Sequence, residues 1–465
     1  MDLVLQKLVD ESFDSMVADI QKSIRIESVL KEENITEKDP FGSNVTAALT
    51  SFLENAEKMG FKTGNVDNYA GYVDLGDKGE LVGILAHLDV VPEGKHELWD
   101  VPPYSATIID GKLYGRGSAD DKGPAFAALY AMKALRDSGM ELKCRFRLIV
   151  GLDEESGGRC IARYLKTEEH PACSFSPDAN FPLINAEKGI LRGYIEKTFL
   201  PAAETPGLRL KSIKGGSRYN VVPDEAEALF YGQISADEVS WLREIPNITV
   251  TLTDNGTSIR AEGLSAHAME PQRGKNAVSL LLKTIASLNW GGTVLRGWIE
   301  FAAEKFADYY GEALNIATED EMSGVLTCNL GIIDCSEDKC KISLDIRYPV
   351  TKKGEDVIST LNETLKEGGA CFTVEKDKKP LFVTPDAPLV KKLLTAYNNI
   401  TGENGVPESI GGGTYCRYVD NAVSFGPLFP GEIELAHQPN ENIPLENLRK
   451  ITYIYTEALR LFAEG

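Results

Sequence analysis

Basic side chains are scarce in this sequence, and that scarcity excludes several kinds of partner. Against 70 aspartates and glutamates stand 49 lysines and arginines, which gives a formal net charge of −21. Because no basic footprint is available, we expect neither nucleic acid nor an anionic membrane as partner. The apolar run 279–288 is interrupted by Lys283 and is too short to cross a bilayer. The first residues lack the basic region and long apolar run of a signal peptide, so we expect a cytoplasmic protein.

Cysteines are few and scattered. The chain has 8 of them and no Cys-x-x-Cys pair, which argues against a zinc ribbon and against a disulfide framework. A reducing cytoplasm is the natural setting for such a pattern. With 465 residues, the chain is long for a single hydrophobic core, so two or more domains are expected. Its 43% hydrophobic and 26% charged residues are ordinary for a globular enzyme.

The most informative stretch is 145–158, where an apolar run at 146–150 predicts a buried strand. The run leads into three consecutive acids, Asp153, Glu154 and Glu155, and then into two glycines. Ionised carboxylates so close together repel one another, and a bound cation would reconcile them. One glutamate would then be a ligand and its neighbour the base for a water. A solvated acidic turn after a strand is the alternative that this stretch leaves open.

A second apolar segment, 81–86, has the composition of a strand that is covered on both faces, and it ends at His87. Because side chains alternate along a strand, His87 and Asp89 point to the same side. A carboxylate beside a histidine can hold the second ring nitrogen, which suits metal binding. An ordinary hydrogen bond of a histidine at a strand end explains this pair equally simply.

The segment 114–124 places glycines on both sides of Arg116, as phosphate-binding loops do. It lacks the Gly-Lys-Ser/Thr ending, so a nucleotide site is disfavoured. Asp120 and Asp121 stand at the entrance of a predicted helix, 125–135, where paired acids favour a cation site. Strand, helix and strand together predict a largely parallel α/β sheet. Ligands of such sheets gather where the strands end.

The remaining candidates are isolated residues. Asp178 lies in a loop of turn-forming residues and, taken alone, is a turn aspartate. Of the 5 histidines, His437 precedes the last predicted helix, 445–462, and His267 stands in Gly-Leu-Ser-Ala-His. His96 and His170 lie among lysines, glutamates and prolines and are interpreted as surface residues.

The middle of the chain has a different pattern. The segment 248–261 alternates around Asn255-Gly256, which predicts a hairpin. Helices are predicted at 275–288 and 355–365, and strands at 327–334 and 341–348. Antiparallel strands with helices on one side indicate a separate α+β domain inserted into the first.

In order along the chain, these motifs resemble the M20 family of dinuclear metallopeptidases, and within it the bacterial PepV-type dipeptidases. The matching pieces are His87-Leu88-Asp89, Gly115-Arg116-Gly117, Asp120-Asp121-Lys122-Gly123, Asp153-Glu154-Glu155-Ser156-Gly157, Pro177-Asp178, Ala266-His267 and Ala436-His437. The resemblance implies a zinc-peptidase-like α/β catalytic domain, with a mixed, largely parallel sheet and flanking helices. An inserted α+β lid domain interrupts it. The expected boundaries are 1–188 and 381–465 for the catalytic domain and 189–380 for the lid.

The resemblance also implies a metal site. His87 and Asp178 would hold one divalent ion, Glu155 and His437 the other, and Asp120 would bridge them. This mixed nitrogen and oxygen set suits zinc, with manganese or cobalt as alternatives. The Asp120–Asp121 peptide bond would be cis, as in the family.

Catalytic roles follow from the same resemblance. Asp89 would orient His87, and Glu154 would be the general base for a metal-activated water. His267 would reach from the lid domain to stabilise the oxyanion.

Substrate-binding roles are implied as well. Asn220, Arg347 and Gly413 would bind the dipeptide, since an arginine and backbone N–H groups suit a terminal carboxylate. A surface arginine at a strand end is the alternative for Arg347. Cys416 stands where a small residue such as alanine is expected, and is interpreted as a buried thiol or a slight change of the pocket.

The sequence thus predicts a cytoplasmic, monomeric, two-metal dipeptidase acting on small peptides. Aminoacylases, carboxypeptidases and desuccinylases share the implied fold and remain alternatives. A non-catalytic metal- or peptide-binding protein is disfavoured, because Glu154 would have no role in metal binding and yet stands beside the expected ligands.

Overall fold

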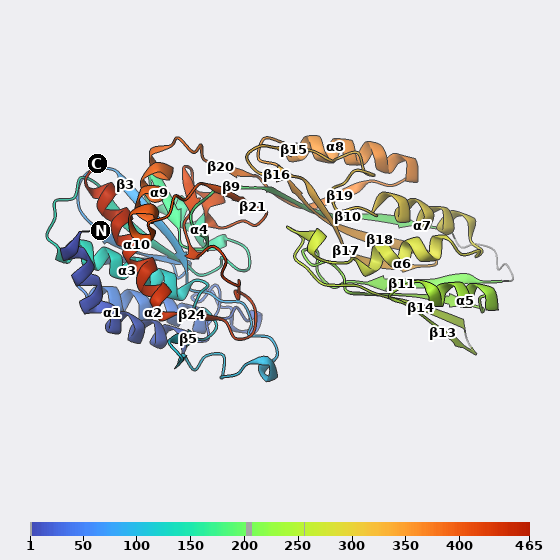
Figure 1. Cartoon of the computed structure of the whole chain (residues 1–465), viewed down its shortest axis with the longest axis horizontal. Helices are drawn as coiled ribbons and strands as arrows, with labels where there is room; N and C mark the ends of the chain where they lie inside the picture. Colours follow the sequence, from blue (N-terminus) through green and yellow to red (C-terminus); the bar gives the residue numbers. More distant parts are fainter. Residues whose placement is uncertain (1, 201–206, 255) are drawn as a thin grey trace. The chain divides into compact units, whose positions relative to one another are not determined.

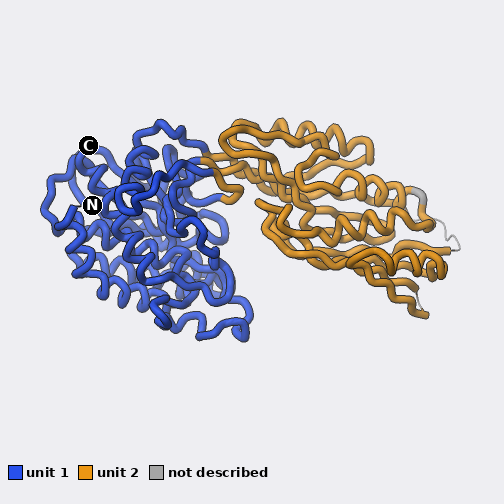
Figure 2. Tube along the Cα trace, viewed as in Figure 1, with its two compact units in different colours: residues 1–185, 382–408, 413–465 blue, residues 186–381, 409–412 orange. Residues whose placement is uncertain are grey.

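The computed structural model describes residues 2–200, 207–254 and 256–465, and its chain divides into two compact units (Figure 2). Unit 1 contains Met1–Asn185, Phe382–Glu408 and Gly413–Gly465. Unit 2 contains Ala186–Leu381 and Ser409–Gly412, which places the short Ser409–Gly412 piece with the inserted segment. Each unit is described separately below.

A nine-stranded mixed sheet organises unit 1, in the order β1-β2-β6-β3-β7-β22-β9-β20, with β21 paired to β9. The central strand β3 runs parallel to β6 and β7, and β22 runs parallel to β7, whereas β1, β2 and β6 pair antiparallel. The expected α/β fold with a mixed sheet is confirmed, with its parallel part at the centre. The strands are β1 (Lys62–Val66), β2 (Ala70–Leu75), β3 (Leu81–His87), β6 (Arg145–Gly151), β7 (Cys173–Ser176), β9 (Ile184–Glu187), β20 (Leu381–Phe382), β21 (Glu408–Ile410) and β22 (Ala422–Ser424).

Helices cover both faces of this sheet. Gly71 of β2 lies against α2, where an added Cβ would come within 2.7 Å of Leu49. The next side chain, Tyr72, points to the other face and packs edge-on against Tyr164 of α4. Elsewhere α3 packs against α1 and α10, and α10 packs against α9 (Figure 1). The helices are α1 (Leu3–Ile24), α2 (Ser43–Lys58), α3 (Lys122–Asp137), α4 (Arg159–Thr167), α9 (Pro388–Thr401) and α10 (Leu445–Ala463).

The start of α2 depends on a glycine. Asn44 fits the amino-acid preference for a helix N-cap, but it lies inside the helix, which begins at Ser43. The N-cap is Gly42, whose φ of 97° reverses the chain in a region that glycine alone enters without strain.

Three smaller sheets accompany the main sheets, two of them in unit 1 and the pair β15–β16 in unit 2. The first joins β24 (Asn442–Pro444), β5 (Lys112–Tyr114) and β4 (Thr107–Ile109). The others pair β8 (Ala179–Asn180) with β23 (Pro427–Leu428), and β15 (Glu319–Asp320) with β16 (Gly324–Val325). The described residues include no helix that is both long and apolar enough to span a membrane.

Unit 2 is built on an antiparallel sheet of eight strands in the order β13-β14-β12-β11-β17-β18-β10-β19. The predicted hairpin is present as β13 and β14, with Thr253 opposite Gly256, while Asn255 lies outside the described residues. The strands are β10 (Gly189–Thr198), β11 (Arg209–Gly215), β12 (Glu225–Tyr231), β13 (Ile248–Thr253), β14 (Gly256–Glu262), β17 (Thr327–Ser336), β18 (Lys339–Tyr348) and β19 (Phe372–Lys378).

The core of unit 2 lies between this sheet and its helices. Ile342, Leu344 and Ile346 of β18 are all fully buried in it, as their alternation predicts. Leu281 and Leu361 contribute from two of the helices. The helices are α5 (Ala236–Glu244), α6 (Ala277–Ala286), α7 (Thr293–Lys305) and α8 (Gly354–Leu365).

Candidate metal centre and active site

The carboxyl ends of the parallel strands of unit 1 meet at one edge of the sheet and carry most of the candidate residues. His87 is the last residue of β3, and it stands opposite Gly151, the last residue of β6. The acids Asp153, Glu154 and Glu155 follow β6 directly, and Asp178 comes two residues after β7. Asp120 precedes α3, and His437 lies in the irregular segment before β24. Apart from Asp153, which pairs with Arg159, these side chains from different parts of unit 1 therefore converge.

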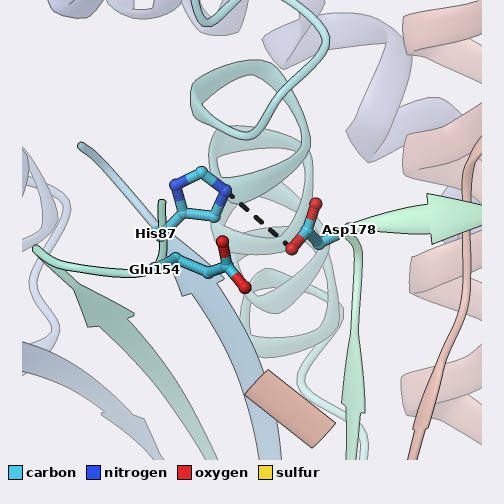
Figure 3. A group of neighbouring side chains, drawn as sticks. All are labelled: His87, Glu154 and Asp178. Carbon is cyan, nitrogen blue, oxygen red and sulfur yellow. Dashed lines mark ion pairs between the residues drawn. The ribbon is translucent and has the colours of Figure 1, made fainter. Parts of the chain in front are cut away.

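His87 is the buried centre of the first group. Its Nδ1 lies 2.9 Å from the carbonyl oxygen of Asp89, which can only accept, so Nδ1 carries a proton. The other ring nitrogen, Nε2, lies 2.9 Å from Asp120 Oδ1 and 3.9 Å from Asp178 Oδ2. In Figure 3 the imidazole faces Asp178, and the carboxylate of Glu154 extends towards the space between them. The ring is thereby oriented with one nitrogen towards the carboxylates.

The carboxylate of Asp89 has a second task. Its two oxygens accept the backbone N–H groups of Glu154 and Glu155, each at 3.2 Å, while Oδ1 lies 3.5 Å from His87 Nδ1. The end of β3 is thus tied to the acidic loop after β6. Asp89 therefore orients His87 mainly through its backbone carbonyl oxygen, which lies closer to Nδ1 than the carboxylate does.

His437 forms the second group. Its Nε2 lies 3.1 Å from Asp120 Oδ2 and 3.0 Å from Glu155 Oε1. Asp120 therefore presents one oxygen to each histidine, the arrangement of a carboxylate between two metal positions. The bond that follows it, Asp120–Asp121, is cis as expected.

Burial and crowding shift the ionisation of these groups. Burial raises the pKa of Glu154 to about 8, with the charges of Glu155, Asp89 and Asp120 acting in the same direction and His87 against it. Burial and the Asp120 charge also raise the pKa of Asp178 well above its usual value. Burial acts to lower the pKa of His437, but its hydrogen bonds to Asp120 and Glu155 prevail and raise it to about 11. Without a cation, protons on the histidines offset the carboxylate charge.

These residues fit a divalent metal ion. Two overlapping groups have their ligand atoms within 4.8 Å of one another: His87 with Glu154 and Asp178, and His87 with Asp120 and Glu155. The buried imidazole of His87 and the more exposed imidazole of His437 stand among partly buried carboxylates, which makes a mixed nitrogen and oxygen donor set with excess negative charge. The geometry alone allows Glu154 as a ligand as well as a base.

Asp153, the first of the three acids, serves the loop itself. It is fully buried, and its carboxylate accepts the backbone N–H, Nε and Nη2 of Arg159, each at 2.8 Å. These bonds cap α4 and fix the loop that carries Glu154 and Glu155. Of the three adjacent carboxylates, one is neutralised by arginine and two face the centre.

Residues that were not assigned from the sequence also contact the centre. Asp121 Oδ2 accepts the backbone N–H of His87 at 3.1 Å, and burial raises the pKa of Asp121 well above its usual value. The ring of Tyr415 packs edge-on against His87, and its hydroxyl lies 2.8 Å from Cys160 Sγ. Glu441 contacts the backbone of Asp120. Asp121 belongs to a motif recognised in the sequence and Glu441 lies four residues after another, and these positions were the available signals.

Within unit 2, the structure brings His267 and Asn220 together. The segments 220–222 and 266–268 pair, with Val222 N–H donating to Ala266 at 2.8 Å and Ala268 N–H to Asn220 at 2.9 Å. Both belong to unit 2, so their expected roles over the metal centre stay predictions.

Arg347 and Gly413 are in different units. Arg347 is 2% exposed, so the alternative of a surface arginine is wrong; it pairs with Asp345 and donates Nη1–H to the Gly411 carbonyl at 2.7 Å. Gly413 belongs to unit 1, and a Cβ there would lie 2.2 Å from Arg417 Nε. Their binding of substrate stays a prediction.

The remaining interpretations concern three side chains. Cys416 is buried, with Sγ 3.5 Å from Ser424 Oγ, as a structural thiol would be. His96 and His170 are exposed, as expected.

Comparison of the sequence with known proteins identifies a family and several relatives. The model of a family described as Peptidase family M20/M25/M40 matches residues 83–461. A Bacillus subtilis (strain 168) protein named "Putative dipeptidase YtjP" is 40% identical over 453 residues, covering 96% of each chain. A Staphylococcus epidermidis protein named "Putative dipeptidase" is 35% identical over 455 residues, again covering 96% of each chain.

The solved structures agree in fold. The crystal structure of an M20 family metallo-carboxypeptidase from Sulfolobus solfataricus gives a TM-score of 0.57 at 17% identity, covering 100% of both chains. At that identity the likeness concerns the fold.

Proposed function

Because the chain belongs to peptidase family M20/M25/M40, we propose that it is a monomeric, cytoplasmic dipeptidase that works with two divalent metal ions. The family is metal-dependent, and the chain is a peptidase. Relatives that match over 96% of their length carry the name "Putative dipeptidase", which supports a short peptide as substrate.

The observation that carries the proposal is the position of Asp120 between two histidines. Its Oδ1 is 2.9 Å from His87 Nε2, and its Oδ2 is 3.1 Å from His437 Nε2. One ion would be held by His87 and Asp178, the other by His437 and Glu155, with Asp120 shared. Two divalent cations, zinc first among them, supply the positive charge that acidifies an attacking water and polarises the scissile carbonyl.

Glu154 is the residue that moves the proton. It takes a proton from the attacking water as the water oxygen bonds to the carbonyl carbon, and it delivers that proton to the amine as the C–N bond breaks. Asp89 accepts the backbone N–H of Glu154, and so ties the base to the segment that follows β3. His267 stabilises the oxyanion, and Asn220, Arg347 and Gly413 bind the peptide, with Arg347 and backbone N–H groups serving its carboxylate.

A substrate panel tests the proposal. The protein is loaded separately with zinc, manganese and cobalt, bound metal is counted, and hydrolysis is followed for dipeptides, tripeptides and N-acyl amino acids. We expect two ions per chain and cleavage of dipeptides, lost on chelation and restored by metal. Cleavage of N-acyl amino acids in place of dipeptides would transfer the assignment to an aminoacylase or desuccinylase. Two bound ions without any hydrolysis would support a non-catalytic binding protein. Gel filtration checks the monomer.

A further inference from the structure

Glu441 is a buried carboxylate outside the proposed ligand set, and it collects donors from the loop that carries Asp120. Its Oε1 accepts the backbone N–H groups of Gly117 and Ala119 at 3.0 Å each and of Asp120 at 3.2 Å. Its Oε2 accepts Nη1–H of Arg116 at 2.6 Å. One side chain therefore accepts hydrogen bonds from three backbone N–H groups and from one nitrogen of the Arg116 guanidinium, all in a single loop.

The same residue is tied to His437 through the chain. Glu441 follows His437 by four residues and immediately precedes β24, which pairs with β5 so that Asn442 stands opposite Tyr114. The carbonyl oxygen of Glu441 accepts the N–H of Gly115 at 3.0 Å, which extends this pairing by one residue. The loop after β5 carries Asp120, and the segment before β24 carries His437. The pairing of Gly115 with Glu441 joins these two segments close to both ligands.

Arg116 anchors this junction to the surrounding chain. It is 1% exposed, and its guanidinium lies over the ring of Trp99 at 5.4 Å from the centroid. Its backbone N–H donates to Pro103 at 2.8 Å. Glu441 is fully buried, so two opposite charges compensate each other away from water. A buried pair of this kind contributes little net stability compared with apolar residues, and a positioning role explains its presence better than stability does.

We propose that Glu441 is a positioning residue for the metal centre, which sets the distance between Asp120 and His437 by holding both chain segments with one buried carboxylate. The proposal rests on the proposed metal-dependent function. Glu441 touches neither substrate nor the reacting atoms, and acts through the backbone of Asp120 and the conformation of the segment that begins at His437.

The negative charge is essential to this role. In a Glu441→Gln variant the side chain keeps its size, but one of its two positions becomes an NH2 group that donates. That group faces either Arg116 or the three backbone N–H groups, so donors oppose donors in both orientations. The loop then relaxes away, and Asp120 loses its place between the histidines. Groups that support metal ligands in this way typically contribute about 10–100-fold in metal affinity.

The test compares two buried glutamates of unit 1. Glu457 on α10 is 1% exposed and accepts Nε and Nη2 of Arg460 and Nδ2 of Asn399, each at 2.9 Å. Glu457→Gln therefore imposes a similar loss on another part of the unit. Zinc affinity is measured on metal-free wild type, Glu441→Gln and Glu457→Gln by competition with a chelator, beside the melting temperature of each metal-free protein.

We expect both variants to melt at lower temperature and only Glu441→Gln to bind zinc about 10–100-fold more weakly. Excess zinc should restore much of its kcat, with KM for a dipeptide little changed. Zinc affinity within about twofold of wild type, or an equal loss in Glu457→Gln, would overturn the proposal. If Glu441→Gln does not fold, Arg116→Lys decides by the same measure, because it keeps the charge and loses the planar guanidinium. A wild type that binds no divalent ion would contradict the proposed function itself, and the positioning role with it.

Discussion

In unit 1 the candidate residues come from strand ends and loops and repel one another, whereas in unit 2 His267 and Asn220 are carried by two paired backbone segments. Asp120, Glu155 and Asp178 are brought together against their charges, and burial raises the pKa values of Glu155 and Asp178. The segments of His267 and Asn220 are joined by ordinary backbone hydrogen bonds. The carboxylates of unit 1 need positive charge beside them, whereas the two segments of unit 2 are held by backbone hydrogen bonds.

The supporting residues differ in the same way. Glu441, a charged group, holds the loop of Asp120, whereas Asn329, a neutral amide, donates to the carbonyls of Tyr219 at 2.9 Å and Val221 at 3.0 Å. Asn329 is fully buried in β17. From this difference we expect residues of unit 1 to govern metal binding, and residues of unit 2 to affect turnover without changing the metal content. The experiments below test this division from the largest expected effect to the smallest.

The largest effect is expected from Glu154→Gln, because this change removes the proton acceptor. The kcat should fall by about 10²–10⁴ while both metal ions are retained. The matched variant is Glu155→Gln, one residue along, which should reduce bound metal. Kinetics and metal analysis of both proteins separate base from ligand. Loss of metal from Glu154→Gln would instead make it a ligand, as its place beside His87 and Asp178 allows.

His267→Ala tests whether unit 2 takes part in the chemistry. We expect kcat to fall by about 10²–10³, the cost of losing one group that stabilises an oxyanion, with metal content unchanged. The control is His170→Ala, since His170 is exposed and its ring bonds locally, to the Leu165 carbonyl at 2.6 Å. A drop of less than about threefold in His267→Ala would confine catalysis to unit 1.

Metal binding should depend on pH because protons compete for the same histidines. The pKa of His437 is raised to about 11 and that of His87 well above its usual value, so both imidazoles carry an extra proton in the metal-free protein at pH 7. A metal ligand must be neutral, so binding releases these protons, and affinity should fall about tenfold per pH unit for each proton displaced as pH decreases. Calorimetry in buffers of different ionisation enthalpy counts the protons, and a count near zero would contradict the assignment.

The smallest effect on turnover is expected from Asn329→Ala. Two carbonyl groups lose their donor, which should cost about 1–3 kcal/mol of stability and raise KM several-fold with little change in metal affinity. Asn185→Ala is the control in unit 1, where Asn185 Nδ2 donates to the Val383 carbonyl at 2.7 Å. Denaturation and dipeptide kinetics are measured for both. If KM changes by the same factor in Asn329→Ala and Asn185→Ala, Asn329 contributes to stability alone.

Local patterns predicted the elements well. The helix expected at 445–462 is α10, Leu445–Ala463, and the strand expected at 146–150 is β6, Arg145–Gly151. These elements follow from apolar spacing, which neighbouring residues supply by themselves. Composition alone does not locate the N-cap of α2, because Asn44 and Gly42 are both plausible, and only the path of the preceding chain selects the positive φ of Gly42.

Site residues were predictable where the local backbone conformation fixes the direction of the side chains. Alternation placed His87 and Asp89 on one side of a strand, and the rule that ligands gather at strand ends joined them to Glu154. Asp178 and His437 were assigned through the family resemblance, because nothing in their own surroundings distinguishes them from turn and loop residues. For Asp120, the pairing with Asp121 indicated a cation site, and the resemblance supplied the bridging role. Arg347 showed the limit of such reading, since the position that suits a surface arginine proved to be buried against Asp345.

The sequence by itself determined the strands, the helices and the chemical types of the donor groups, because these depend on spacing within a few residues. Only the tertiary structure decided which oxygen of Asp120 faces which histidine, and that Glu441 closes on Arg116 across 325 positions of the chain. Contacts of this kind depend on the parallel order of the strands and on the pairing of β5 with β24. Short-range patterns do not encode them, because the partners meet only after the sheet has formed.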